Sequence, residues 1–82
     1  MRTLADLKPG ESGIIKGFAD HILSLKLMEM GCIPGADIKV VSIAPMGDPM
    51  AIKISGYMLG LRKSEAAVIL LELKSKEIID GK

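Results

Sequence analysis

The chain has 82 residues and a formal net charge of +1, with one cysteine, one phenylalanine, one tyrosine and no tryptophan. A domain of this length buries only about 60% of the surface that its unfolded chain exposes, which leaves little room for a deep catalytic cleft. The balanced charge gives no electrostatic argument for nucleic acid or an anionic membrane. A lone cysteine excludes an internal disulfide and fits a reducing compartment. We therefore expect one cytoplasmic domain over residues 1–82, with an aliphatic, methionine-rich core.

The N-terminal segment and the hydropathy of the chain predict neither export nor membrane insertion. Met1 to Asp6 is polar and no apolar segment follows it, so we expect no signal peptide. The chain contains no run of about 18 apolar residues, so we expect no direct membrane insertion.

The first third of the chain predicts a turn, a strand and a helix. Residues 3–6 fit one helical turn, and Pro9 and Gly10 occupy the centre of a turn. Ser12–Phe18 is a predicted strand with glycines near both ends, as at the corners of a small barrel. Asp20 is the expected N-cap of a helix over 21–30.

This predicted helix is apolar on two sides. Its core stripe is expected at the i, i+4 and i+7 positions, occupied by Leu23, Leu27 and Met30. Leu25 and Met28 then lie on nearly the opposite face, with Lys26 on their flank. A small barrel can cover only one of these faces. The other is left either to a partner or to the N-terminal segment 1–7 of the same chain.

A short corner is expected to join this helix to the next strand. Gly31 fits the left-handed conformation at which many helices end, which costs glycine nothing. Pro34 and Gly35 fit the two central positions of a type II turn. Directly after it, the apolar period changes to two, and Asp37–Ala44 is a predicted strand.

The second half of the chain predicts three further strands. A loop with two prolines over 44–49 precedes a hairpin that turns at Ser55 and Gly56. A short helical segment capped by Ser64 precedes the last strand, and 75–82 is expected to fray or to extend that strand. The remaining strands are expected at Met50–Ser55, Tyr57–Arg62 and Val68–Leu73. This order predicts a mainly β fold with one α-helix, an SH3-like small five-stranded β-barrel.

The titratable residues give little support for an enzyme or a metal centre. The single His21 and Cys32 lie eleven positions apart with a helix between them, and no third group is marked to orient such a pair. We therefore expect no catalytic activity and no cofactor. Asp20 and His21 are weak candidate metal ligands, amounting to half a site. We favour Asp20 as a helix cap and His21 as an exposed residue, and a metal site shared between two chains is left open.

Protein binding has positive support in the pattern. Large apolar side chains occupy five positions that the pattern leaves outside the core: Leu25, Met28, Met46, Met50 and Met58. Methionine adapts well to binding surfaces. Nucleic-acid binding is disfavoured because the chain has no aromatic platforms for bases and its basic residues do not cluster.

Three motifs in this order resemble the FeoA family over nearly the whole chain. They are Leu27-x-x-Met30-Gly31-x-x-Pro34-Gly35, the loop Ala44-Pro45-Met46-Gly47-Asp48-Pro49, and Gly56-Tyr57-x-Leu59-x-Leu61-Arg62-Lys63-x-Glu65-Ala66. The resemblance implies an SH3-like domain that assists bacterial ferrous iron uptake. It also implies a partner, the membrane transporter FeoB, which carries a cytoplasmic GTP-binding domain.

Two alternatives and a set of partner-binding residues complete these expectations. Similar SH3-like domains end metal-dependent repressors of the DtxR type, so a metal-responsive regulatory domain is the alternative function. A weak homo-oligomer is also left open. The candidate partner-binding residues are Leu25, Lys26, Met28, Met46, Asp48 and Met58. The loop residues Met46 and Asp48 join this set because two prolines hold that loop ready for contact.

Overall fold

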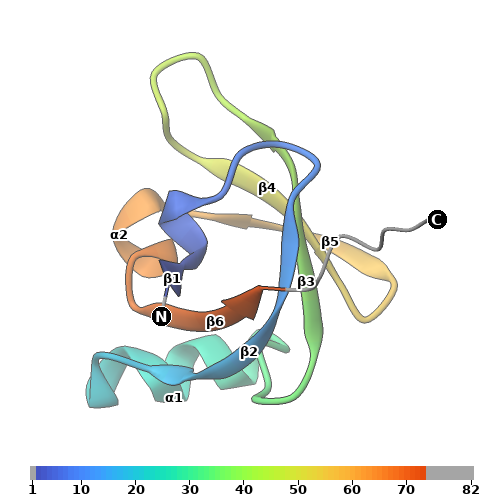
Figure 1. The fold of residues 1–82 in the computed structure, drawn as a ribbon. Coiled ribbons are helices and arrows are strands. Elements are labelled where there is room, and N and C mark those ends of the chain that lie inside the picture. The colour runs from blue at the N-terminus through green and yellow to red at the C-terminus, as the bar shows by residue number, and fades with distance from the viewer. Residues whose placement is uncertain (1, 74–82) are drawn as a thin grey trace, which may run out of the picture.

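The computed structural model describes residues 2–73, and Figure 1 shows their arrangement. The strands are β1 (Arg2–Thr3), β2 (Ser12–Phe18), β3 (Asp37–Ile43), β4 (Met50–Ile54), β5 (Tyr57–Leu61) and β6 (Ile69–Leu73). The helices are α1 (His21–Glu29) and α2 (Lys63–Ala66), and a 3₁₀ turn spans Leu4–Asp6. The predicted tail over 75–82 lies outside the described residues. Within the described part of the chain, no helix is long and apolar enough to cross a membrane.

The strands form one antiparallel sheet in the order β1-β6-β2-β3-β4-β5. Register shifts between Ile15 and Gly17 in β2, and between Val40 and Ser42 in β3, mark bulges that bend these strands. The bent sheet curls around the core in the manner of a small barrel (Figure 1). The predicted class, mainly β with one main helix, is confirmed. The five predicted strands are all present, and the two-residue β1 is an additional strand.

The corner after α1 forms as its glycines predicted. The helix ends at Glu29, one residue earlier than expected. Gly31 has φ +106°, and the N–H groups of Gly31 and Cys32 donate to carbonyls of the last helical turn at 3.0 and 2.9 Å. Gly35 has φ +95°, and a 3.0 Å hydrogen bond closes the turn over 33–36. The bonds from Gly31 and Cys32 satisfy carbonyls that a helix end otherwise leaves without partners.

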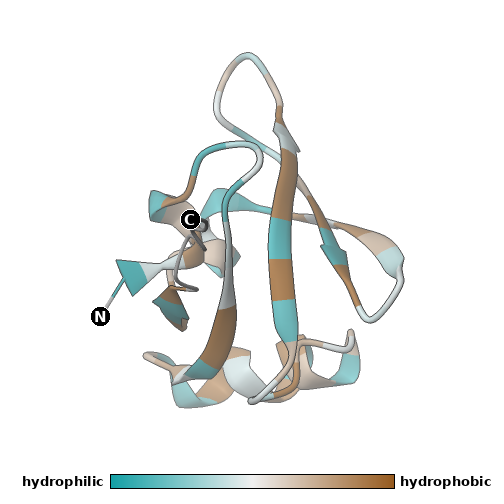
Figure 2. Ribbon diagram, turned by 45° about the vertical axis from the view of Figure 1, so that its right-hand side comes forward, coloured by the Kyte–Doolittle hydropathy of each residue, from teal (hydrophilic) through white to brown (hydrophobic). Residues whose placement is uncertain are grey.

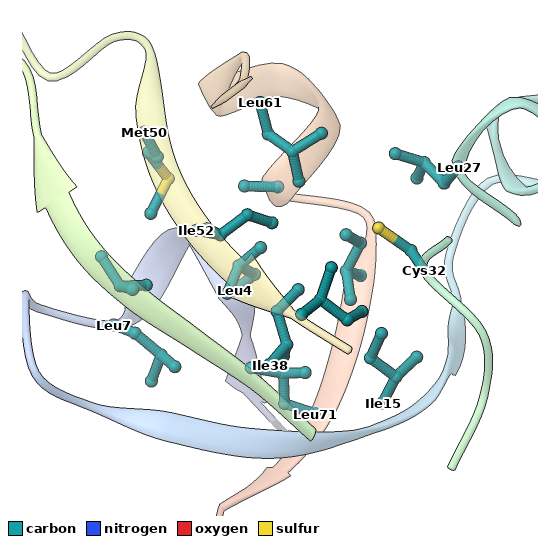
Figure 3. Close-up of a cluster of buried hydrophobic side chains, with 14 residues drawn as sticks. Leu4, Leu7, Ile15, Leu27, Cys32, Ile38, Met50, Ile52, Leu61 and Leu71 are labelled. Carbon is teal, nitrogen blue, oxygen red and sulfur yellow. The ribbon is translucent and has the colours of Figure 1, made fainter. Parts of the chain in front are cut away.

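The core is aliphatic and lies inside the curled sheet (Figure 3). The N-terminal segment contributes to it, since Leu4 and Leu7 are 0% and 2% exposed. The expectation that Met50 lies outside the core is wrong, because its side chain is 2% exposed. Met50, Ile52 and Ile54 occupy alternate positions of β4. Because successive side chains of a strand point to opposite faces, all three lie on the inner face.

Helix α2 is capped differently from the prediction. Ser64 is exposed inside the helix, and Arg62 occupies the N-cap position. The Glu65 Oε1 atom accepts a hydrogen bond from the Arg62 N–H at 2.8 Å, and Asp48 Oδ1 accepts one from the Lys63 N–H at 2.7 Å. Two carboxylates therefore satisfy N–H groups at the positive end of α2.

Candidate functional site

Helix α1 lies across one end of the barrel, beneath the lower ends of β2 and β3 in Figure 2. Its start is set by Asp20, whose Oδ1 atom accepts a hydrogen bond from the Leu23 N–H at 3.0 Å. The predicted N-cap is therefore confirmed. His21 lies exposed on the first turn.

The buried face of α1 differs from the predicted stripe. Leu27 is fully buried, as expected, but Leu23 and Met30 are only partly buried against the core. Ser24 takes the second inward position at 6% exposure. Its Oγ atom donates to the His21 carbonyl at 2.6 Å, so burial leaves no polar group unpaired.

The opposite side of α1 is exposed and carries large apolar side chains. Ile22 is 80% exposed and Leu25 is 58% exposed, with Lys26 and Glu29 exposed beside them. We call these four residues the outer face of α1. Met28 is half-buried at its edge rather than fully outward. Leu4 and Leu7 of the N-terminal segment enter the core rather than covering Leu25, which remains 58% exposed.

Lys26 holds this face in place through an ion pair with a buried carboxylate. Its Nζ atom lies 3.0 Å from Oε2 of Glu65, which is 7% exposed. The hydrogen bond from the Arg62 N–H, and then the Lys26 ammonium, lower the pKa of Glu65 despite its burial. Lys26 was expected to flank Leu25 and Met28 as a candidate partner-binding residue. The structure shows that it links α1 to α2, while its stem remains exposed.

The other candidate partner-binding residues lie on the β3–β4 loop and on β5 rather than on α1. Met46 is 91% exposed in the loop between β3 and β4, and Asp48 in the same loop binds the start of α2. Met58 is 52% exposed on β5. Figures 1 and 2 both show the β3–β4 loop at the end of the barrel opposite α1. The six residues therefore lie at three separate locations, on α1, on the β3–β4 loop and on β5, rather than on one surface.

The residues considered for catalysis or metal binding are also apart. His21 is exposed, whereas Cys32 is fully buried and packs near Leu27 in Figure 3. Burial raises the pKa of the Cys32 thiol, which keeps it protonated and unreactive. Among residues 2–73, no group of three or more His, Cys, Asp or Glu side chains is placed to hold a metal ion.

Sequence reasoning missed two residues of this region. Ile22 could have been found, because it lies three positions before Leu25 and therefore on the same side of a helix. No local pattern in the sequence indicated that Tyr57 contacts the end of α1. Its Oη atom donates to the Met30 carbonyl at 3.1 Å and lies beside Gly31, so β5 contacts the end of α1.

The model of the FeoA domain family matches residues 2–73. A Porphyromonas gingivalis protein, described as a fusion of Fe(2+) transport protein A and the Fe(2+) transporter FeoB, is 34% identical over 73 residues. That match covers 88% of this chain but only 9% of the fusion protein. The FeoA-like protein from Clostridium acetobutylicum has a structure with a TM-score of 0.85 and 34% identity, covering 96% of this chain and 93% of that one.

Less similar structures bear on the fold alone. Stenotrophomonas maltophilia FeoA, described as a prokaryotic SH3 domain protein, has a TM-score of 0.74 at 23% identity, over 88% of this chain and 91% of its own. A manganese-dependent transcriptional repressor has a TM-score of 0.79 at 16% identity, over 89% of this chain and 41% of its own. The predicted SH3-like fold is thus confirmed. With its family model matched from residue 2 to residue 73, the chain belongs to the FeoA family.

Proposed function

We propose that this domain is an accessory component of bacterial ferrous iron uptake that acts by binding an FeoB-type transporter. One observation carries the proposal: in the Porphyromonas gingivalis relative, a segment similar to this chain shares one polypeptide with the transporter. Fusion holds two domains at a high effective concentration, which is useful when the domains act together.

The outer face of α1 is the surface that we propose for docking, and the cytoplasmic GTP-binding domain of the transporter is the proposed occupant. Burying a fully exposed leucine or isoleucine contributes about 1.5–3 kcal/mol, so covering Ile22 and Leu25 favours association. The Lys26–Glu65 ion pair supports this face by holding α1 against α2. Met28 at its edge adds apolar surface. Met46, Asp48 and Met58 are proposed as separate, secondary contacts.

Calorimetric titration of the chain against this cytoplasmic domain, with and without guanine nucleotide, tests the proposal. We expect saturable binding that Leu25→Gln weakens about tenfold, equivalent to about 1.4 kcal/mol. Val41→Gln is the matched control, because Val41 is 42% exposed on β3 and lies outside the proposed surface. Absence of binding in every nucleotide state contradicts the proposed function. Full binding by Leu25→Gln contradicts only the docking face.

Metal retention separates this proposal from the metal-responsive alternative. An accessory domain that acts by protein contact should lose added iron or zinc on dialysis at neutral pH. One metal ion retained per chain, and lost in His21→Ala, would instead support a regulatory metal site that includes Asp20 and His21.

A further inference from the structure

Strand β5 is the last strand of the sheet and pairs with β4 on one side. The β4–β5 hairpin turns through Ser55 and Gly56, which have φ values of +51° and +85°, as in a type I′ turn. In such a turn, the two residues that flank it, here Ile54 and Tyr57, form a hydrogen-bonded pair. Along an antiparallel pair of strands, hydrogen-bonded and non-hydrogen-bonded residue pairs then alternate. The bonded pairs are Ile54–Tyr57, Ile52–Leu59 and Met50–Leu61, and the others are Lys53–Met58 and Ala51–Gly60.

It follows that the N–H and C=O groups of Met58 and Gly60 point away from β4, toward the free edge. This edge is open. Met58 is 52% exposed, Gly60 is exposed, and a side chain built at Gly60 would meet no atom within 4 Å. Natural edge strands are usually protected by prolines, charged residues, bulges or short length. The five residues of β5 contain neither a proline nor a charge.

The side chains around this edge are basic. Lys53 lies directly beside Met58 on the outward face, and Arg62 continues the outward row of β5 in extended conformation. The Lys16–Glu72 and Lys26–Glu65 ion pairs use other cations. Of the nearby carboxylates, Asp48 binds a backbone N–H and Glu65 is engaged by Lys26. Asp37 on β3 lines the same surface pocket as Lys53. Two basic side chains, Lys53 and Arg62, therefore flank the apolar Met58 along this edge.

We propose that β5 accepts an extended, acidic segment of the transporter's cytoplasmic part as an additional strand of the sheet. This inference rests on the proposed function and names a second contact within it. The outward-facing N–H and C=O groups of Met58 and Gly60 bond the backbone of the added strand. An apolar side chain of that strand packs on Met58, and acidic side chains lie near Lys53 and Arg62.

Amide hydrogen exchange, followed residue by residue by NMR on the full chain, tests this inference. In the free chain, the Met58 and Gly60 amides exchange rapidly while that of Leu59, which donates to β4, is protected. A synthetic peptide that alternates valine and glutamate protects the first two amides, whereas its valine–lysine counterpart does not. The transporter's cytoplasmic domain produces the same protection as the acidic peptide.

Two variants separate backbone pairing from charge. Gly60→Pro removes a donor at the free edge without removing a β4–β5 hydrogen bond, and it weakens binding of the acidic peptide at least tenfold. Lys53→Glu weakens it severalfold, whereas Lys39→Glu, one strand further from the edge, changes it little. If Gly60→Pro does not fold, Lys53→Glu and its control still decide the outcome.

Each result has a distinct meaning. Binding of the cytoplasmic domain without protection of Met58 and Gly60 overturns this inference and leaves the proposed function standing. Protection by the acidic peptide without any binding of the domain supports the strand site but overturns the transporter as partner. Protection that rises with the concentration of the chain alone assigns the edge to a second copy and overturns the inference. Failure of both peptides and of the domain to protect the edge also overturns it.

Discussion

Gly31 is the residue at which helix α1, the following turn and strand β5 meet. Its φ of +106° ends the helix, and the Tyr57 hydroxyl lies where a side chain at position 31 would begin. Glycine is required there for two independent reasons, one of the backbone and one of packing. Gly35 has a similar φ of +95° but no atom within 4 Å of a built side chain. A substitution at Gly35 therefore measures the cost of the backbone conformation alone.

We predict that Gly31→Ala lowers the free energy of unfolding more than Gly35→Ala does. The left-handed conformation costs a non-glycine residue about 1–2 kcal/mol, which both variants should show. The excess in Gly31→Ala comes from the Tyr57 hydroxyl, and adding Tyr57→Phe should remove much of it. Urea denaturation of the unsubstituted chain and of these three variants measures the differences. Equal losses for the two glycine variants would contradict the contact with Tyr57.

Glu65 predicts a pH dependence of stability. Its pKa is lowered from the ordinary value of 4.5, chiefly by the hydrogen bond from the Arg62 N–H. A group with a lowered folded-state pKa contributes stability that is present above the unfolded-state pKa and is lost as the pH falls through the folded-state value. We therefore expect the free energy of unfolding to decline below about pH 4.5. Glu65→Gln should remove part of this decline.

At pH 7 the same substitution should cost about 1–2 kcal/mol, because it removes the charge from hydrogen bonds with the Arg62 N–H and Lys26. Glu72→Gln is the matched control. It breaks the Lys16–Glu72 pair, whose side chains are 46% and 65% exposed, and exposed pairs contribute little. Urea denaturation from pH 3 to 7 compares the two variants. Similar pH profiles for both would show that Glu65 has no special role.

At the scale of the element, α1 is a helix whose two sides are both apolar. Leu27 and Ser24 face the core, while Ile22 and Leu25 face outward. The amphipathic pattern alone is ambiguous because leucine, isoleucine and methionine occupy positions all around the helix. The buried side of the helix includes Ser24 rather than a second leucine. Ser24 can be buried there because its hydroxyl donates to a carbonyl of the same helix.

We predict opposite results for the same substitution on the two sides of α1. Leu25→Gln should leave the thermal midpoint nearly unchanged, because surface substitutions usually change stability by less than about 0.5 kcal/mol. Leu27→Gln should cost several kcal/mol, because it places a polar amide in the core. Thermal unfolding followed by circular dichroism compares them. A strongly lowered midpoint for Leu25→Gln would remove the outer face of α1 from the docking proposal.

At the scale of the whole molecule, the core is assembled from both ends of the described chain. Leu4 in the 3₁₀ turn and Leu71 in β6 are 0% and 1% exposed, and β1 pairs with β6 beside them. The N-terminal segment thus contributes to the core itself. Leu4 and Leu7 therefore do not cover the outer face of α1, where Ile22 and Leu25 remain exposed.

We predict that Leu4→Ala destabilises the protein as strongly as Leu27→Ala, by about 2–5 kcal/mol each, because both side chains are fully buried. For a domain of this size, each kcal/mol lowers the thermal midpoint by about 4–8 °C. Ala5→Gly is unsuitable as a control because Ala5 packs against the core, so Lys8→Ala, at an exposed position, serves instead. A midpoint for Leu4→Ala close to that of Lys8→Ala would contradict the described packing.

The sequence by itself determined the five main strands, the start of α1 and the corner that follows it. Alternation predicted the five main strands to within about a residue, and the Asp20 cap and the glycines at 31 and 35 were predicted correctly. These features depend on residues within one turn or one strand, so neighbouring side chains are enough to specify them.

Only the tertiary structure decided how the elements contact one another. The burial of Ser24, the Lys26–Glu65 ion pair and the free edge at Met58 each depend on where a helix or strand docks. The partners in the ion pair lie 39 positions apart, beyond any local pattern. Periodicity shows that a face is apolar, but packing selects which of two apolar faces is buried, because the selected face must also fit the core in shape.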